Sequence, residues 1–133
     1  MQAGRELDAK VAEALGWQWA ETHLGLEGLF PPEGDIRYNT ALYGPLRFDK
    51  DGYLETMPRY STSWAGMGEL IEEARKQRLE IALVSNASGH WARVFPEGNY
   101  PDDPFLADHS DPDSMPYAAC MALLKAKGVI ANA

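Results

Sequence analysis

The segment RYSTSW, residues 59–64, places three hydroxyl side chains between an arginine and a tryptophan, just before a stretch with helical periodicity. The N-terminus of a helix presents unpaired N–H groups and a partial positive charge, so it binds anions readily. The arginine would add charge, the hydroxyls would add donors, and an aromatic ring could stack on a base. The candidate ligand-binding residues here are Arg59, Tyr60, Ser61, Thr62 and Trp64.

The same residues have a purely structural interpretation. One hydroxyl would cap the helix, while Tyr60 and Trp64 would pack as a hydrophobic staple or as part of the core. The segment is not a glycine-rich phosphate loop, since Gly66 and Gly68 fall inside the predicted helix. At this level the pattern is compatible with a nucleotide-binding helix N-terminus and with an ordinary helix cap.

A second group of candidate ligand-binding residues lies in HWARVF, residues 90–95, which has the composition of a strand. Side chains alternate along a strand, so Trp91, Arg93 and Phe95 share one face. On an open sheet face, Trp91 and Arg93 would form part of a ligand platform. The alternative is a half-buried aromatic side chain beside a solvated charge.

Residues that could support catalysis or hold a metal are sparse. His23, His90 and His109 are far apart in the sequence, and we predict no metal, no cofactor and no catalytic residue. The single cysteine, Cys120, excludes an intramolecular disulfide and a multi-cysteine zinc site. It lies in the middle of an alanine-rich helix, where a thiol is usually a small hydrophobic side chain. A Cys120–His109 pair is the alternative that would make the protein an enzyme.

Residues 96–116 are predicted to form a long acidic loop without lysine or arginine. Its acidic residues are Glu97, Asp102, Asp103, Asp108, Asp111 and Asp113. No alignment of these residues matches the ligand spacing of a calcium-binding EF-hand loop. A DNA mimic would spread its carboxylates over a surface rather than confine them to one loop. The pattern therefore favours a solvated loop.

Composition excludes several classes of protein. A chain of 133 residues is long enough for one ordinary domain, and 45% hydrophobic residues can build its core. The net charge of −8 argues against non-specific nucleic-acid binding, which needs clustered basic residues. The chain has no apolar run of about 20 residues, as a membrane-spanning helix requires, and no signal-peptide pattern. We expect a cytoplasmic protein.

The hydrophobic pattern predicts an α+β fold of one domain, with a small antiparallel sheet flanked by helices in an α/β sandwich. The predicted elements are a helix at 5–16, a strand at 17–20, a helix at 62–78 with Trp64 in its apolar stripe, strands at 79–85 and 90–95, and a helix at 113–128. Residues 20–58 form a Gly/Pro-rich insertion with a hairpin at 46–56.

Three blocks of the chain, in this order, resemble the phage ABA-sandwich family, small proteins of bacteriophage and prophage genomes. The blocks are GRELDAKVAEALGW at 4–17, YSTSWAGMGELIEEA at 60–74 and PYAACMALLKA at 116–126. The strand pair that carries HWARV also lies where the family has its hairpin. The resemblance implies the sandwich fold and a phage origin, and it brings no set of catalytic residues.

By analogy with small non-structural phage proteins, which often bind host factors or sequester host signalling molecules, we expect a phage accessory protein that binds rather than transforms. Its partner would be a small anionic, nucleotide-like ligand at the helix N-terminus, in the cytoplasm of the infected host cell. The alternative is a host protein bound through an acidic and aromatic surface without a pocket. A small sheet with exposed edges also predicts a homo-oligomer.

Overall fold

The computed structural model describes residues 1–44, 47–98, 100 and 104–131. Its elements are α1 (Arg5–Ala14), β1 (Gln18–Glu21), β2 (Glu27–Phe30), α2 (Arg37–Leu42), α3 (Trp64–Lys76), β3 (Leu79–Asn86), β4 (Gly89–Pro96), β5 (Ala107–Asp111) and α4 (Met115–Ala126). β1 and β2 form a two-stranded antiparallel sheet, and β3, β4 and β5 form a three-stranded antiparallel sheet in that order. The predicted α+β single domain is confirmed.

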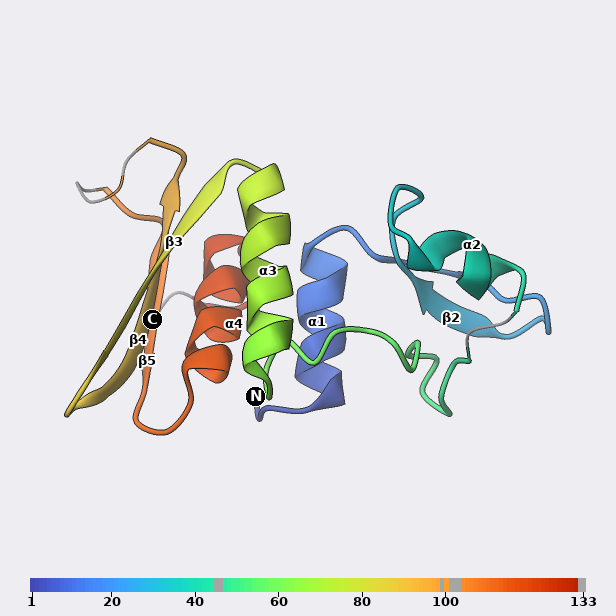
Figure 1. The fold of residues 1–133 in the computed structure, drawn as a ribbon, viewed down its shortest axis with the longest axis horizontal. Coiled ribbons are helices and arrows are strands. Elements are labelled where there is room, and N and C mark those ends of the chain that lie inside the picture. Colours follow the sequence, from blue (N-terminus) through green and yellow to red (C-terminus); the bar gives the residue numbers. More distant parts are fainter. Residues whose placement is uncertain (45–46, 99, 101–103, 132–133) are drawn as a thin grey trace.

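Figure 1 shows the elements stacked along the long axis of the molecule. The β3–β4–β5 sheet lies at one end, α3 and α4 pack against it, α1 packs beside these helices, and the β1–β2 hairpin and α2 lie beyond α1. Helices therefore cover one face of the three-stranded sheet. No helix or strand of the described residues covers its other face, which we call the outer face.

α4 is the central element, with nine of its twelve residues buried. Its alanine-rich body allows close packing against the sheet on one side and against α1 and α3 on the other. The predicted start of this helix is confirmed, because Ser114 Oγ accepts a hydrogen bond from Tyr117 N at 3.1 Å and Pro116 occupies the first turn. Gly128 follows its end with a φ of 74°, as a helix stop requires.

The β3–β4 hairpin is also formed as predicted, with Asn86 paired to Gly89 across a two-residue turn. Asn86 Oδ1 accepts a hydrogen bond from Ser88 N at 2.9 Å, which stabilises the turn. Gly89 has a φ of 125°, and a Cβ atom there would lie 2.8 Å from Pro112 Cα. Only glycine fits this position, so the turn and the start of β4 have one well-defined geometry.

Three sequence-based expectations are corrected by the structure. The 96–116 segment is not loop throughout, because β5 lies within it and pairs with β4; Asp102 and Asp103 lie outside the described residues. The 46–56 hairpin is reduced to one antiparallel bridge, Phe48 to Leu54, and Leu46 lies outside the described residues. Trp64 is 62% exposed and does not join the apolar stripe of α3.

In the described part of the chain, no helix combines the length and the apolar character needed to cross a membrane.

Candidate binding site on the outer sheet face

The outer face carries a cluster of aromatic side chains around one arginine. Along β4, Ala92 and Val94 are completely buried against the helices, so Trp91, Arg93 and Phe95 point to the other side. The register continues this cluster across the sheet. The neighbours on β3 are Val84, Ala82 and Glu80, and those on β5 are Ser110 and Asp108.

Arg93 is held in place by two aromatic rings and one carboxylate. Its guanidinium carbon lies 4.6 Å from the centroid of the Trp91 ring and 4.1 Å from that of Phe105. Its NH2 group lies 3.4 Å from Asp108 Oδ2, which is a long contact for an ion pair. Its Nε is buried and has no hydrogen-bond partner among the described residues. The arginine therefore sits in a fixed position with hydrogen-bonding capacity left over.

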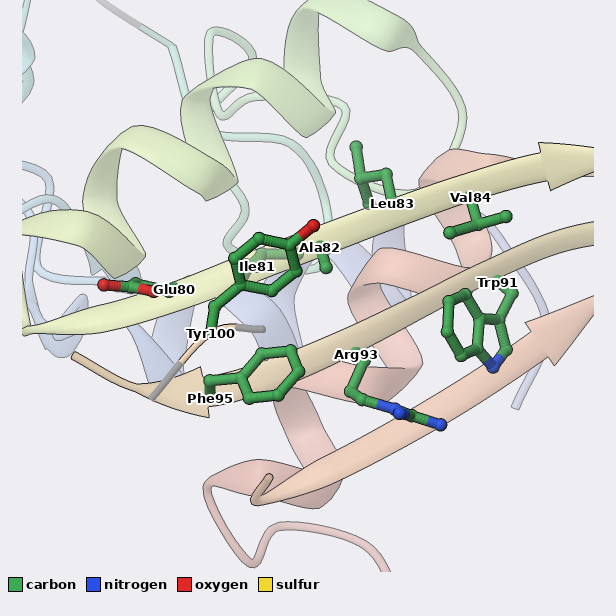
Figure 2. Close-up of a pocket in the computed structure, with 9 residues that line it drawn as sticks. All are labelled: Glu80, Ile81, Ala82, Leu83, Val84, Trp91, Arg93, Phe95 and Tyr100. Carbon is green, nitrogen blue, oxygen red and sulfur yellow. The ribbon is translucent and has the colours of Figure 1, made fainter. Parts of the chain in front are cut away.

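A groove of about 550 Å³ runs beside Arg93 along β3 and β4 (Figure 2). Ala82 and Val84 form its apolar floor on β3. Trp91 lies near one end, and the rings of Phe95 and Tyr100 stand at the other, with their centroids 5.4 Å apart. A volume of this size is within the range of small-molecule sites, which combine apolar walls with a few polar groups. This groove matches that description, with Arg93 as its cation.

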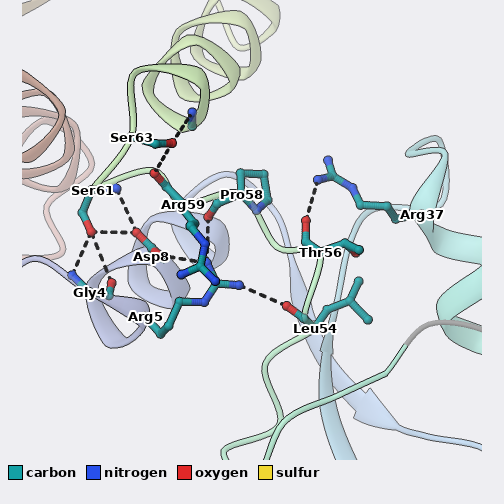
Figure 3. A network of polar contacts seen from close by, with 11 residues as sticks. Gly4, Arg5, Asp8, Arg37, Leu54, Thr56, Pro58, Arg59, Ser61 and Ser63 are labelled. Atoms are coloured by element: carbon teal, nitrogen blue, oxygen red, sulfur yellow. Dashed lines mark hydrogen bonds and ion pairs between the residues drawn. The ribbon is translucent and has the colours of Figure 1, made fainter.

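The N-terminus of α3, by contrast, is closed by the chain that precedes it. Ser63 Oγ accepts a hydrogen bond from Gly66 N at 2.9 Å, so one hydroxyl of RYSTSW is the helix cap (Figure 3). Arg59 O in turn accepts hydrogen bonds from Ser63 Oγ and from the backbone N–H of Thr62. These donors are used within the protein, which leaves fewer for an anion at this helix end.

Ser61 and Tyr60 are both buried. Ser61 Oγ lies 2.7 Å from Asp8 Oδ1 and accepts a hydrogen bond from Gly4 N (Figure 3). Tyr60 is 1% exposed within the main core, and burial raises the pKa of its phenol strongly. Arg59, Thr62 and Trp64 remain exposed. The structure therefore divides the predicted group of ligand-binding residues between the core and the surface.

The structure does not bring the two predicted groups together. Trp91 and Arg93 lie on the outer face of the sheet, whereas α3 and the segment before it pack on the opposite face. Residues 59–64 line none of the five best-formed pockets of the described residues, while Trp91 and Arg93 line the groove described above. Phe105 and Asp108 were not predicted as site residues, because their contacts with Arg93 depend on the pairing of β5 with β4. Tyr100, whose ring packs against Phe95, was not predicted either.

The remaining chemistry-bearing groups have structural surroundings. Cys120 is completely buried in α4, and this burial raises the pKa of its thiol strongly, so it lacks the thiolate that a nucleophile needs. Trp17 is 4% exposed and belongs to the core, whereas Trp19 is 42% exposed and lies at its rim. The described residues contain no group of three or more His, Cys, Asp or Glu side chains that could hold a metal ion.

The surroundings of His109 are expected to make the stability of the protein depend on pH. It lies on β5 with its Nδ1 atom 2.9 Å from Lys125 Nζ and its ring against Tyr117. Burial, and then the Lys125 charge, lower the pKa of His109, while Asp111 and Asp108 oppose this shift. The unfolded chain, where histidine has a pKa of about 6.5, then binds more protons than the folded state.

Neutral His109 therefore stabilises the folded protein above about pH 6.5, the pKa of histidine in the unfolded chain. This stabilisation is lost as the pH falls through the lowered pKa of the folded state. We expect the melting temperature of the protein to fall across that window more steeply than that of His109→Gln. Lys125→Met, which removes the nearby charge, should reduce the difference. If the melting temperature depended on pH equally in all three proteins, His109 would not be the group responsible.

The chain matches no family model, no curated protein and no solved structure. The resemblance to the phage ABA-sandwich family therefore stays a prediction.

Proposed function

We propose that the protein is a binding protein whose outer sheet face holds a small ligand that combines a planar ring with a negative charge, as a nucleotide does. The observation that carries this proposal is the position of Arg93. It is fixed between two aromatic rings at the edge of the groove, with one long contact to Asp108 and a buried Nε that no described residue hydrogen-bonds. The resemblance to phage proteins supports an accessory role, such as sequestering a host signalling molecule.

The charges on this face favour a ligand with few negative groups. Arg93 is the cation of the groove, while Glu80 lines the same groove and Asp108 already contacts the guanidinium. An incoming phosphate or carboxylate would compete with Asp108 for Arg93, and a second anionic group would meet Glu80. We therefore favour a monophosphate or monocarboxylate whose ring lies on the apolar floor or against an aromatic wall.

The experiment is a thermal-shift screen with nucleoside monophosphates, followed by calorimetry of any nucleotide that raises the melting temperature. A ligand specific to the folded state stabilises it in proportion to concentration by mass action. Trp91→Leu should weaken binding about 10-fold or more, because stacking of a base on an aromatic ring contributes about 1–3 kcal/mol. Arg93→Gln should weaken it by a similar factor, because a hydrogen bond to a charged group contributes about 1.5–3 kcal/mol.

Trp64→Leu is the matched control, because Trp64 is an exposed tryptophan at the start of α3, which packs on the other side of the sheet. It should leave the affinity unchanged. A loss of affinity in Trp64→Leu as large as that in Trp91→Leu would indicate that the ligand binds at the N-terminus of α3. Absence of a shift with every nucleotide would reject the ligand proposal.

A second candidate function, binding of a host protein, is favoured by the lobe formed by residues 17–58. Its exposed apolar side chains include Leu24, Leu26, Ile36 and Tyr43, with exposed fractions of 74%, 66%, 92% and 76%. Leu24 and Leu26 also border a second groove, of about 770 Å³. An exposed apolar pair beside a groove, such as Leu24 and Leu26, is a feature of protein interfaces. The double variant Leu24→Ser with Leu26→Ser should abolish partner binding and leave nucleotide binding unchanged.

A further inference from the structure

Within the described part of the chain, β3 has a free edge with unpaired backbone groups. It pairs with β4 on one side only. The two-residue turn pairs Asn86 with Gly89, and Arg78 O accepts a hydrogen bond from Glu97 N at the other end of the hairpin. Hydrogen-bonded pairs alternate along an antiparallel ladder, so the even-numbered residues of β3 bond to β4. The N–H and C=O groups of Ile81 and Leu83 then point to the free edge, where no described residue bonds to them.

The two edges of this sheet differ in their protection against another strand. β5 is five residues long and carries three ionisable side chains, Asp108, His109 and Asp111. β3 is eight residues long, LEIALVSN, and carries only Glu80. Charged residues and short length are the usual means of keeping an edge strand unpaired. β3 is long, carries a single charge and contains no proline, so it is a template for strand addition.

We propose that β3 pairs antiparallel with β3 of a second copy, about a two-fold axis at Ala82, to give a six-stranded sheet. In this register, Ala82 lies opposite Ala82 of the second copy, and Ile81 lies opposite Leu83. Residues that face each other then lie on the same face of the sheet, as side-chain alternation requires. The free N–H and C=O groups of both strands become hydrogen bonded.

The sequence of β3 is complementary to itself in this register. Each Glu80 lies opposite Val84 of the second copy, so the two Glu80 carboxylates do not repel each other across the interface. The apolar side chains of Ile81 and Leu83 face one another on the inner side. A two-fold axis closes the assembly at two copies, because the same edge is used on both sides. The acidic β5 edges are left at the two ends, where their charge discourages further addition.

Pairing would also bring the two outer-face grooves together. Ala82 and Val84 form the floor of the groove and lie on the edge strand, so the groove is bounded by β4 on one side only. The same residues of the second copy would extend the floor to a second Trp91 and a second Arg93. The pairing itself rests on the β3 edge and does not depend on the ligand proposed above.

The first test is the mass of the purified protein, measured by light scattering over a concentration series. We expect a rise to twice the mass of one chain. The register is tested with Ala82→Cys, because two cysteines at a directly opposed pair of an antiparallel ladder lie within disulfide range, at a Cα separation of about 4.5–5.5 Å. The natural Cys120 is completely buried and does not compete.

Val84→Cys is the matched control, since it lies on the same face two residues away and would oppose Glu80 of the second copy. Under mild oxidation, Ala82→Cys should form a covalent dimer at least 10-fold faster than Val84→Cys. Ala82→Lys, which opposes two like charges at the axis, should lower the dimer fraction. A monomer at every concentration without cross-linking, or equal cross-linking of both cysteine variants, would overturn the proposal, whatever the outcome of the nucleotide screen.

Discussion

Gly66→Ala is expected to destabilise the protein strongly, although alanine is the better helix former. Gly66 lies in the first turn of α3, where the backbone of Arg59 and Tyr60 crosses the helix. A Cβ atom at position 66 would lie 2.1 Å from Arg59 O and 2.3 Å from its carbonyl carbon. Both contacts are with backbone atoms, so no change of side-chain rotamer can relieve them.

The clash should therefore displace the 59–61 segment, which carries the buried side chains of Tyr60 and Ser61. Overpacking of this kind costs about 1–3 kcal/mol, and displacement of two core anchors places Gly66→Ala at the upper end of that range or beyond. Urea unfolding followed by circular dichroism measures the loss.

Gly68→Ala, two residues further along the same helix, is the matched control. A Cβ atom at position 68 meets no heavy atom within 4 Å. This substitution should follow helix propensity alone and stabilise the protein by up to about 1 kcal/mol. Opposite signs for the two glycines are thus the expected result. Equal and small changes at both positions would show that the 59–61 segment does not pack against α3 as described.

α1, α3, α4 and the β3–β4 hairpin could be predicted from the sequence because their signals are local, whereas α2 and β2 in the 20–58 insertion were not predicted. Ser114 and Gly128 mark the ends of α4, and the NASG turn marks the hairpin. β5 could not be predicted in this way, because ADHSD has the composition of a loop and is a strand only through its pairing with β4. The register that places Asp108 opposite Arg93 is likewise a property of the sheet.

The candidate site was divided for a similar reason. Periodicity predicted that Trp91 and Arg93 share a face, and the structure confirms this arrangement. Local sequence patterns do not show which face of the sheet the helices cover. The separation of Trp91 and Arg93 from α3 could therefore not be predicted. Trp64 illustrates the same limit, since its spacing predicts a place in the apolar stripe of α3, whereas the structure leaves it 62% exposed. Topology decides both points.

The second large effect is expected at Asp8, a completely buried carboxylate in α1. Its Oδ1 atom accepts hydrogen bonds from the backbone N–H of Ser61, at 2.8 Å, and from Ser61 Oγ, at 2.7 Å. Its Oδ2 atom lies 3.0 Å from Arg5 NH1. Arg5 also donates to the carbonyl oxygens of Leu54 and Pro58, both at 3.2 Å (Figure 3). This network joins α1 to the segment that leads from the 17–58 lobe into α3.

Asp8→Ala should lower the free energy of unfolding by about 3–5 kcal/mol, because it leaves the Arg5 charge and the Ser61 donors without their acceptor. Ser61→Ala removes only the hydroxyl and retains the backbone hydrogen bond, so a loss of about 1–2 kcal/mol is expected. Glu72→Ala breaks the exposed Arg75–Glu72 pair and should change stability by less than about 1 kcal/mol. Urea unfolding of the three variants measures this order. An Asp8→Ala effect as small as that of Glu72→Ala would mean that the lobe is held to α1 by packing alone.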